Sequence, residues 1–273
     1  MSHMSKCKVS VILPTYNRSD FILDSILSVL EQSFGNFEII VVDDGSDDNT
    51  ESVVNSIDDD RVRYIKNEQN IGIVRSLNRG IDLAEGEYIA RIDDQDKWID
   101  EYKLEKQVDF LKSHPDHVLV GTGGIVNDIN NNELFRYTKP QNDKKIRENI
   151  LLKNCFIHVS TIFRKRAFWE AGGYDESEQF VEDYGLWLRM GAVGKMANIQ
   201  TYSVSYISDS DGISTQKKVQ QFKKNFKLIR GHKKNYPNYL KGLFRNSIRL
   251  VIYGYLDFKF LRSLTSKFNK SFS

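Results

Sequence analysis

Three carboxylates stand within four residues of one another in this chain. Asp93, Asp94 and Asp96 directly follow the apolar segment Tyr88–Ile92. If they were dehydrated and unpaired, these side chains would repel one another by several kcal/mol. A cation, or a ligand that carries one, would remove this repulsion, whereas a solvated acidic loop is the alternative interpretation. The pattern favours a cation-dependent ligand site.

Two further polar segments follow apolar runs earlier in the chain. Pro14, Thr15, Tyr16 and Asn17 come after the run at 9–13, and Asp43, Asp44, Gly45 and Ser46 come after the run at 37–42. In an open parallel sheet, ligands bind at the carboxyl ends of the strands. We therefore expect these segments to share one site with the acidic segment, although the second could also be only a turn with a helix cap.

The elements that must position these side chains alternate between strand and helix. Apolar runs predict strands at 9–13, 37–42, 62–65 and 88–92, and helical spacing predicts helices at 22–30, 50–56 and 74–83. Further helices are expected at 101–113, 144–152, 165–171 and 182–193. This order predicts an α/β fold, a Rossmann-like and mostly parallel central sheet flanked by helices.

Glycine-rich phosphate loops are missing from the sequence. There is no Gly-Lys-Ser/Thr segment, and Val126 stands where the pattern that begins at Gly121 needs its last glycine for a dinucleotide loop. A phosphate-bearing ligand must therefore be neutralised in another way, and a metal ion on the acidic segment would do so.

Charge divides the chain into two parts. Up to Ser214 it has 24 Lys+Arg against 36 Asp+Glu, whereas from Thr215 onward it has 15 against the single acid Asp257. We predict a domain at 5–214, with a nucleotide-binding half at 5–100 and an acceptor half at 101–214, and a basic amphipathic helical tail at 215–273. Membrane-surface binding is our first interpretation of the tail. Packing on the acidic domain and dimerisation are alternatives, and nucleic acid is not expected as a partner.

The sequence also suggests where the protein works. Its two cysteines, Cys7 and Cys155, are far apart and predict no disulfide framework, so a reducing cytoplasm is expected. The first four residues resemble a cloning remnant, and we expect neither a signal peptide nor a membrane span. With the tail, this predicts a cytoplasmic protein at the inner face of the membrane.

Six segments, in this order, resemble the family 2 glycosyltransferases of bacterial cell-surface polysaccharide synthesis. They lie at 9–18, 41–46, 70–72, 86–90, 172–175 and 182–189. The resemblance implies a GT-A fold that transfers a hexose, with inversion, from a UDP-sugar to a glycan or lipid-linked acceptor. It covers about residues 8–214 and leaves the tail out.

The resemblance also implies roles in nucleotide-sugar binding. Tyr16 would stack on the base, with Pro14 and Thr15 shaping its pocket. Asp44 would accept a hydrogen bond from the ring N–H of uracil, supported by Asp43. The remaining donor-site residues implied are Asn17, Gly72, Asn78, Asp93 and Asp94.

The chain departs from the family pattern at the metal site. Where relatives commonly place the carboxylate that holds Mn²⁺ or Mg²⁺, this chain has Gln95, whose amide oxygen is a weaker ligand for a hard cation. Asp94 and Asp96 are the expected substitutes. A second departure is Asp209, in place of a basic group that touches the diphosphate, and it either supplies a metal ligand or is an ordinary loop acid.

Asp183 is the expected general base, since its carboxylate can take the proton of the acceptor hydroxyl. Capping of the helix that follows is the alternative role of this residue. Glu182, His158 and Trp187 are expected on the acceptor side, although His158 is equally suited to a structural role and Trp187 to the core. Two competing functions stay open, namely a catalytically impaired transferase-like binding subunit and a carboxylate-pair glycoside hydrolase.

Overall fold

The computed structural model describes residues 8–207 and 217–255. The strands are β1 (Val9–Thr15), β2 (Phe37–Asp43), β3 (Val62–Lys66), β4 (Tyr88–Arg91), β5 (Lys97–Trp98), β6 (His117–Asn127), β7 (Glu133–Tyr137), β8 (Ile162–Arg164) and β9 (Lys195–Ile207). The helices are α1 (Ile22–Leu30), α2 (Thr50–Asn55), α3 (Ile73–Leu83), α4 (Lys103–Ser113), α5 (Asp143–Asn149), α6 (Lys165–Glu170), α7 (Glu182–Val193), α9 (Lys218–Gly231) and α10 (Tyr239–Tyr255), with 3-10 turns η1 (His158–Ser160) and η2 (Glu176–Glu178).

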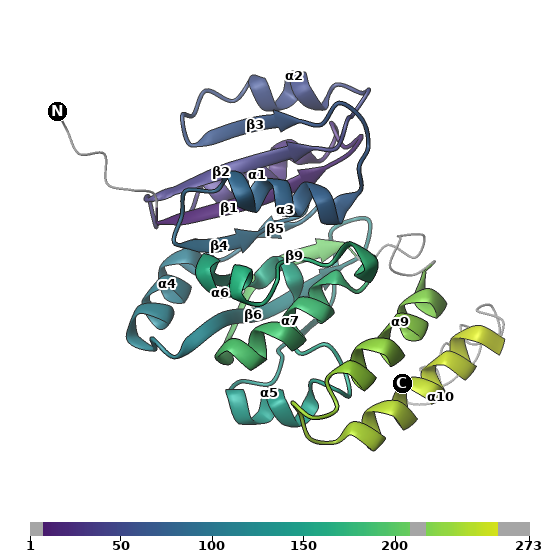
Figure 1. The fold of residues 1–273 in the computed structure, drawn as a ribbon. Helices are drawn as coiled ribbons and strands as arrows, with labels where there is room; N and C mark the ends of the chain where they lie inside the picture. Colours follow the sequence, from purple (N-terminus) through teal and green to yellow (C-terminus); the bar gives the residue numbers. More distant parts are fainter. Residues whose placement is uncertain (1–7, 208–216, 256–273) are drawn as a thin grey trace.

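One sheet forms the centre of the described part of the chain (Figure 1), with the strand order β3-β2-β1-β4-β8-β6-β9-β5 and with β7 paired to β6. Strands β3, β2, β1 and β4 are parallel to their neighbours. Strand β8 runs antiparallel to both β4 and β6, so β6 and its parallel partner β9 share the direction of β4. The predicted Rossmann-like, mostly parallel sheet flanked by helices is confirmed.

Two apolar layers cover the faces of this sheet. Along β1, Val11 and Leu13 pack with residues of α1 and α4, whereas Ile12 packs with residues of α3, α6 and α7. Strand side chains alternate between faces. Because every residue of β1 and β2 is buried, these strands read as continuous apolar runs in the sequence.

The strand register brings the polar segments to one edge of the sheet. Thr15, the last residue of β1, is paired with Asp43, the last residue of β2, and Arg91 at the end of β4 lies beside Ile12. A glycine follows at Gly45, where φ is +83° and a Cβ would come within 2.8 Å of the Gln69 backbone. The turn after β2 can therefore lie close against the loop that precedes α3.

The two C-terminal helices form a hairpin that packs on the rest of the fold (Figure 1). The Tyr236 hydroxyl donates to the Leu188 carbonyl of α7 at 2.8 Å, and Asn246 of α10 donates to the Phe222 carbonyl of α9 at 2.8 Å. At Gly242, a Cβ would lie 2.5 Å from the Leu151 carbonyl oxygen, so α10 approaches the domain closely. No helix in the described ranges is both long and apolar enough to cross a bilayer.

Candidate active site

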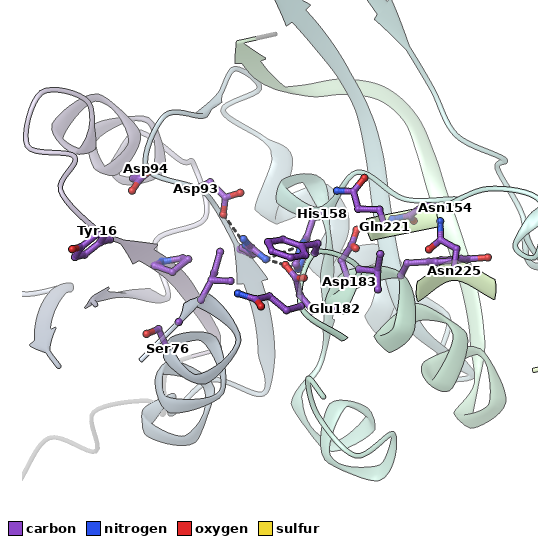
Figure 2. Close-up of a pocket in the computed structure, with 18 of the residues that line it drawn as sticks. Tyr16, Ser76, Asp93, Asp94, Asn154, His158, Glu182, Asp183, Gln221 and Asn225 are labelled. Atoms are coloured by element: carbon purple, nitrogen blue, oxygen red, sulfur yellow. Dashed lines mark hydrogen bonds and ion pairs between the residues drawn. The ribbon is translucent and has the colours of Figure 1, made fainter. Parts of the chain in front are cut away.

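A pocket of about 810 Å³ lies at the carboxyl edge of the parallel strands. Figure 2 shows Tyr16 and Asp94 at one end, and Asn154, Gln221 and Asn225 towards the other. Asp93, Glu182, Asp183 and His158 lie between them. The first end is built from the loops after β1, β2 and β4, and the second from residues near α5, from α7 and from the C-terminal hairpin.

Tyr16 and Asp44 are the predicted base-binding residues that line the first end, together with Pro14, Thr15 and Gly72. The Tyr16 ring is 45% exposed, so one of its faces is open to a planar ligand. Asp44 accepts hydrogen bonds from the backbone N–H groups of Ile71 and Gly72, each at 2.9 Å. The Asp44 carboxylate thus holds the loop before α3 against the turn after β2.

Three other predicted donor-site residues hold the walls of the pocket together and are not among the residues that line it. Asp43 is fully buried and accepts from the Ser46 backbone N–H at 2.7 Å and from the Tyr64 hydroxyl. The Asn17 side chain accepts from the Asp47 backbone N–H at 3.0 Å. Asn78 donates to the Tyr174 carbonyl at 2.9 Å and accepts from the Tyr174 N–H at 3.2 Å.

The acidic segment has three different environments. Asp93 lines the pocket and pairs with Arg91 Nε at 2.7 Å. Burial and the charge of Asp93 raise the pKa of Asp94, which also lines the pocket, to about 6. Burial and the same charge raise the pKa of Asp96 well above its usual value, but Asp96 does not line the pocket. Among the described residues, Asp94 lines the cavity without forming an ion pair, unlike Asp93.

Gln95 has a partner of its own. With its amide oxygen turned towards Arg18, it accepts hydrogen bonds from Arg18 Nε at 2.9 Å and Nη2 at 3.3 Å. Arg18 lines the same end of the pocket as Asp94. Gln95 thus holds a guanidinium group at this end of the pocket, which suits a phosphate.

A metal ion would have few protein ligands here. Among residues 8–207 and 217–255, no group of three or more His, Cys, Asp or Glu side chains is arranged to hold one. Burial and the charge of Asp93 disfavour the ionised form of Asp94, so an added positive charge would stabilise it. This fits a cation bound by Asp94 together with ligand phosphate oxygens, as Mg²⁺ often is. The proposed ligand Asp209 lies outside the described residues.

A buried arginine connects the two ends of the pocket. Arg91 is 3% exposed, and its Nη1 lies 2.6 Å from His158 Nδ1. Although burial opposes it, the charges of Asp93 and Glu182 raise the Arg91 pKa. Burial and the Arg91 charge hold the His158 pKa well below its usual value, so the imidazole is neutral. His158 Nε2 also lies 2.6 Å from the Tyr174 hydroxyl.

The predicted base lies in the first turn of α7. Asp183 lines the pocket, and Asn154 donates to its Oδ2 at 2.6 Å. Burial raises the Asp183 pKa, which makes its carboxylate a stronger base. Burial and the Asp183 charge raise the Glu182 pKa to about 7, and one Glu182 oxygen is buried without a partner. Burial therefore raises the pKa of both neighbouring acids, and the Asn154 hydrogen bond favours the charged form of Asp183.

Trp187 lies in the core, at 0% exposure, and does not line the pocket. Its ring contacts His158 edge to face, with centroids 5.5 Å apart. Sequence reasoning missed Arg18, Arg91 and Asn154, as well as the residues that line the pocket from the C-terminal hairpin. Arg91 could have been noticed, because it is a charged residue at the end of an otherwise apolar strand.

Known proteins resemble this chain in sequence. The sequence pattern described as "Glycosyl transferase family 2" matches residues 10–172. The chain belongs to this family. Two Escherichia coli relatives are named UDP-Glc:alpha-D-GlcNAc-diphosphoundecaprenol beta-1,3-glucosyltransferases. One, WfgD, is 35% identical over 199 residues, covering 73% of this chain and 74% of its own length. The other, WfaP, is 30% identical over 210 residues, covering 77% and 80%.

Solved structures agree with the family 2 assignment at the level of fold. S. aureus TarS 1–349 in complex with UDP-GlcNAc is similar with a TM-score of 0.69 at 18% identity, covering 89% of this chain and 72% of that one. A mannosyltransferase from Pyrobaculum calidifontis, solved with GDP-Man and Mn²⁺, has a TM-score of 0.61 at 18% identity, covering 99% and 82%. The predicted GT-A fold and family 2 membership are therefore confirmed.

Proposed function

We propose that this family 2 member is an inverting hexosyltransferase that moves a sugar from a UDP-sugar to a glycan or lipid-linked acceptor in cell-surface polysaccharide synthesis. One observation carries the proposal. A single pocket joins an exposed aromatic ring and Asp44 at one end to a basic carboxylate, Asp183, further along. The names of the two E. coli relatives, which specify UDP-Glc and a lipid-linked acceptor, support the same substrate classes.

Each side chain has a defined part in this reaction. Asp183 takes the proton of the acceptor hydroxyl as the oxygen attacks the anomeric carbon, and the bond from that carbon to the diphosphate oxygen breaks. UDP leaves with the bonding electrons. Arg18, held by Gln95, lies where it can bind the diphosphate. A divalent cation, when bound by Asp94, would add positive charge against the leaving group.

Calorimetric titration with UDP, with and without Mn²⁺, tests the donor site. We expect the wild-type protein to bind UDP. The Tyr16→Ala variant should bind UDP about 5- to 150-fold more weakly, since stacking on a base contributes about 1–3 kcal/mol. Tyr102→Ala is the matched control, because that ring is 47% exposed but does not line the pocket. If the wild type did not bind UDP, a hydrolase would be favoured. If it bound UDP without turnover, an impaired transferase would be favoured.

The pH dependence of transfer tests the role of Asp183. The Asn154 amide donates to the charged form of Asp183, so Asn154→Ala should raise the pKa of the carboxyl group. Because the base must be deprotonated, the rising limb of kcat/KM should then move to higher pH, with activity lost most on the acidic side. Asn149→Ala, in a half-buried helical position outside the pocket, should leave the limb in place. An identical profile for both variants contradicts the assignment.

We also propose that α10 contacts an anionic membrane. Leu240, Phe244, Ile248 and Val251 recur at helical spacing and are 75%, 69%, 44% and 56% exposed. The exposed cations Lys241 and Arg245 share this helix, and the sequence from Thr215 onward has 15 basic residues against one acid. An apolar stripe beside basic side chains suits the surface of a bilayer with negative headgroups.

Flotation with anionic liposomes tests this contact. Leu240→Ser with Phe244→Ser should weaken binding by about tenfold or more, because burial of each side chain contributes about 1.5–3 kcal/mol. The matched control is Ile129→Ser, which removes an apolar side chain that is 78% exposed between β6 and β7. Point variants are preferable to removal of the tail, since the hairpin is part of the pocket wall. Equal flotation of wild type and double variant would rule the contact out.

A further inference from the structure

The far end of the pocket is walled by the C-terminal hairpin. Gln221, Asn225 and Ile229 of α9 and Asn246 and Arg249 of α10 line it, together with Lys153 and Asn154. The hairpin is anchored by the hydrogen bond from Tyr236 to Leu188 and by the close approach of Gly242 to Leu151. These residues therefore belong to a fixed surface of the cavity.

Two cations at this end have no acidic partner. Within residues 8–207 and 217–255, neither Lys153 nor Arg249 forms an ion pair with a carboxylate, although Arg249 is partly buried. Lys139 lies nearby and donates to the Asn154 carbonyl at 3.1 Å. Burial and the charges of Lys153 and Arg249 lower the pKa of Lys139, whereas the charge of Asp183 raises it, so Lys139 lies within electrostatic reach of both cations.

Grouping like charges in a partly buried pocket is unfavourable unless a ligand compensates for them. Phosphate groups are suitable ligands, since Lys and Arg donate charge-assisted hydrogen bonds to their oxygens. The Asn225 side-chain oxygen is also buried at this end without a partner. It offers an acceptor for a hydroxyl or N–H group of the same ligand.

The anion expected here is distinct from the diphosphate of the donor. Tyr16, Asp94 and Arg18 mark the donor end, and Asp183 lies between that end and Asn225 (Figure 2). A sugar whose hydroxyl faces Asp183 from the hairpin side would direct its other substituent towards Arg249 and Lys153. That substituent must be anionic for the charges to match.

We propose that Arg249 and Lys153 form a subsite for the diphosphate group of a glycosyl diphosphate acceptor, with Asn225 contacting its sugar. The inference rests on the proposed transferase function, because it places the acceptor hydroxyl at Asp183. It assigns to the C-terminal hairpin a direct part in acceptor recognition.

Titration of decyl diphosphate into the UDP-saturated full-length protein tests the subsite. Wild-type protein should bind it and should not bind decyl glucoside, which has the same chain without the charge. Arg249→Gln and Lys153→Gln should each weaken binding by about tenfold, the loss expected for one charge-assisted hydrogen bond. Both variants should bind UDP like the wild type.

The matched control is Lys223→Gln, which removes one positive charge from an exposed position of α9 outside the pocket. Lys153 is exposed, so its variant should keep the fold even if Arg249→Gln does not. Unchanged affinity in Lys153→Gln, or equal loss in Lys223→Gln, overturns the proposal. Tighter binding of decyl diphosphate than of inorganic pyrophosphate assigns the subsite to a lipid-linked diphosphate, and equal binding assigns it to the diphosphate alone.

The proposed function and the subsite can fail separately. Absence of UDP binding in the wild type would contradict the UDP-sugar proposal. The titration repeated without UDP would still show whether Arg249 and Lys153 hold a diphosphate.

Discussion

Replacing Asp183 with asparagine should abolish sugar transfer while nucleotide affinity stays at the wild-type level. Loss of a general base typically slows a reaction by about 10²–10⁴-fold, and the amide of asparagine cannot take the acceptor proton. The donor residues Tyr16 and Asp44 do not depend on this side chain. Single-turnover transfer from a UDP-sugar and calorimetry with UDP would measure the two quantities separately.

Glu182→Gln is the informative comparison for this prediction. With a pKa of about 7, the Glu182 side chain carries a proton over much of the acidic range, and glutamine resembles that protonated form. We therefore expect Glu182→Gln to keep most of the activity below neutral pH, where Asp183→Asn is inactive. If the two variants lost activity to the same extent at all pH values, Asp183 would not be the distinct base.

Much of the fold could be predicted from the sequence because its first half is built from local patterns. The buried runs at β1 and β2 and the spacing in α1 and α3 are set by neighbouring residues, and α7 begins and ends at the predicted residues, Glu182 and Val193. No strand beyond residue 92 was placed, so β5 to β9 and the antiparallel pairing of the second half were missed. Strands β5 and β8 are two and three residues long, too short for a periodic signal, whereas β6 and β9 are 11 and 13 residues long.

The site could be predicted where one segment carries the chemistry. Tyr16, Asp44, Asp94 and Asp183 stand in recognisable motifs, and all four line the pocket. Residues that act through distant partners could not be assigned in this way. Arg91 meets His158 across 67 residues, and nothing local to either residue indicates the contact. The same holds for the hairpin, whose basic composition indicated an anionic partner but not that its helices line the pocket.

The role inferred for Gln95 from the sequence differs from the role that the structure supports. From the sequence it is a weakened metal ligand. With its amide oxygen turned towards Arg18, Gln95 is an acceptor for that guanidinium group, whose charge acts on Asp94. Part of the neutralisation that a bound ion would give can thus be supplied by the chain itself. Because a guanidinium group stays charged at all working pH values, this contribution needs no bound ion.

Replacing Arg91 with methionine should both destabilise the protein and impair transfer. The side chain is 3% exposed and pairs with Asp93, and removal of one partner from a buried pair costs about 3–5 kcal/mol. Since Asp93 itself is 38% exposed and can be hydrated, we expect a loss near the lower value, about 3 kcal/mol. For a chain of this size that corresponds to a fall in Tm of about 6–12 °C.

Loss of Arg91 should also change the titration of the two acids on α7. Its charge lowers the pKa values of Glu182 and Asp183, so both should rise in Arg91→Met. A larger fraction of the base is then protonated at any given pH, and transfer should recover partly as the pH is raised. Thermal unfolding and kcat/KM against pH measure the two effects independently.

Two variants separate the charge of Arg91 from its shape. Arg91→Lys keeps the charge and should retain the wild-type pH profile more closely than Arg91→Met, although it loses part of the contact with His158. Arg136→Met is the matched control, because Arg136 forms an exposed ion pair with Glu133 and such pairs contribute little. If Arg91→Met and Arg136→Met unfolded at the same temperature with the same pH profile, the buried guanidinium would not be what compensates the acids of this pocket.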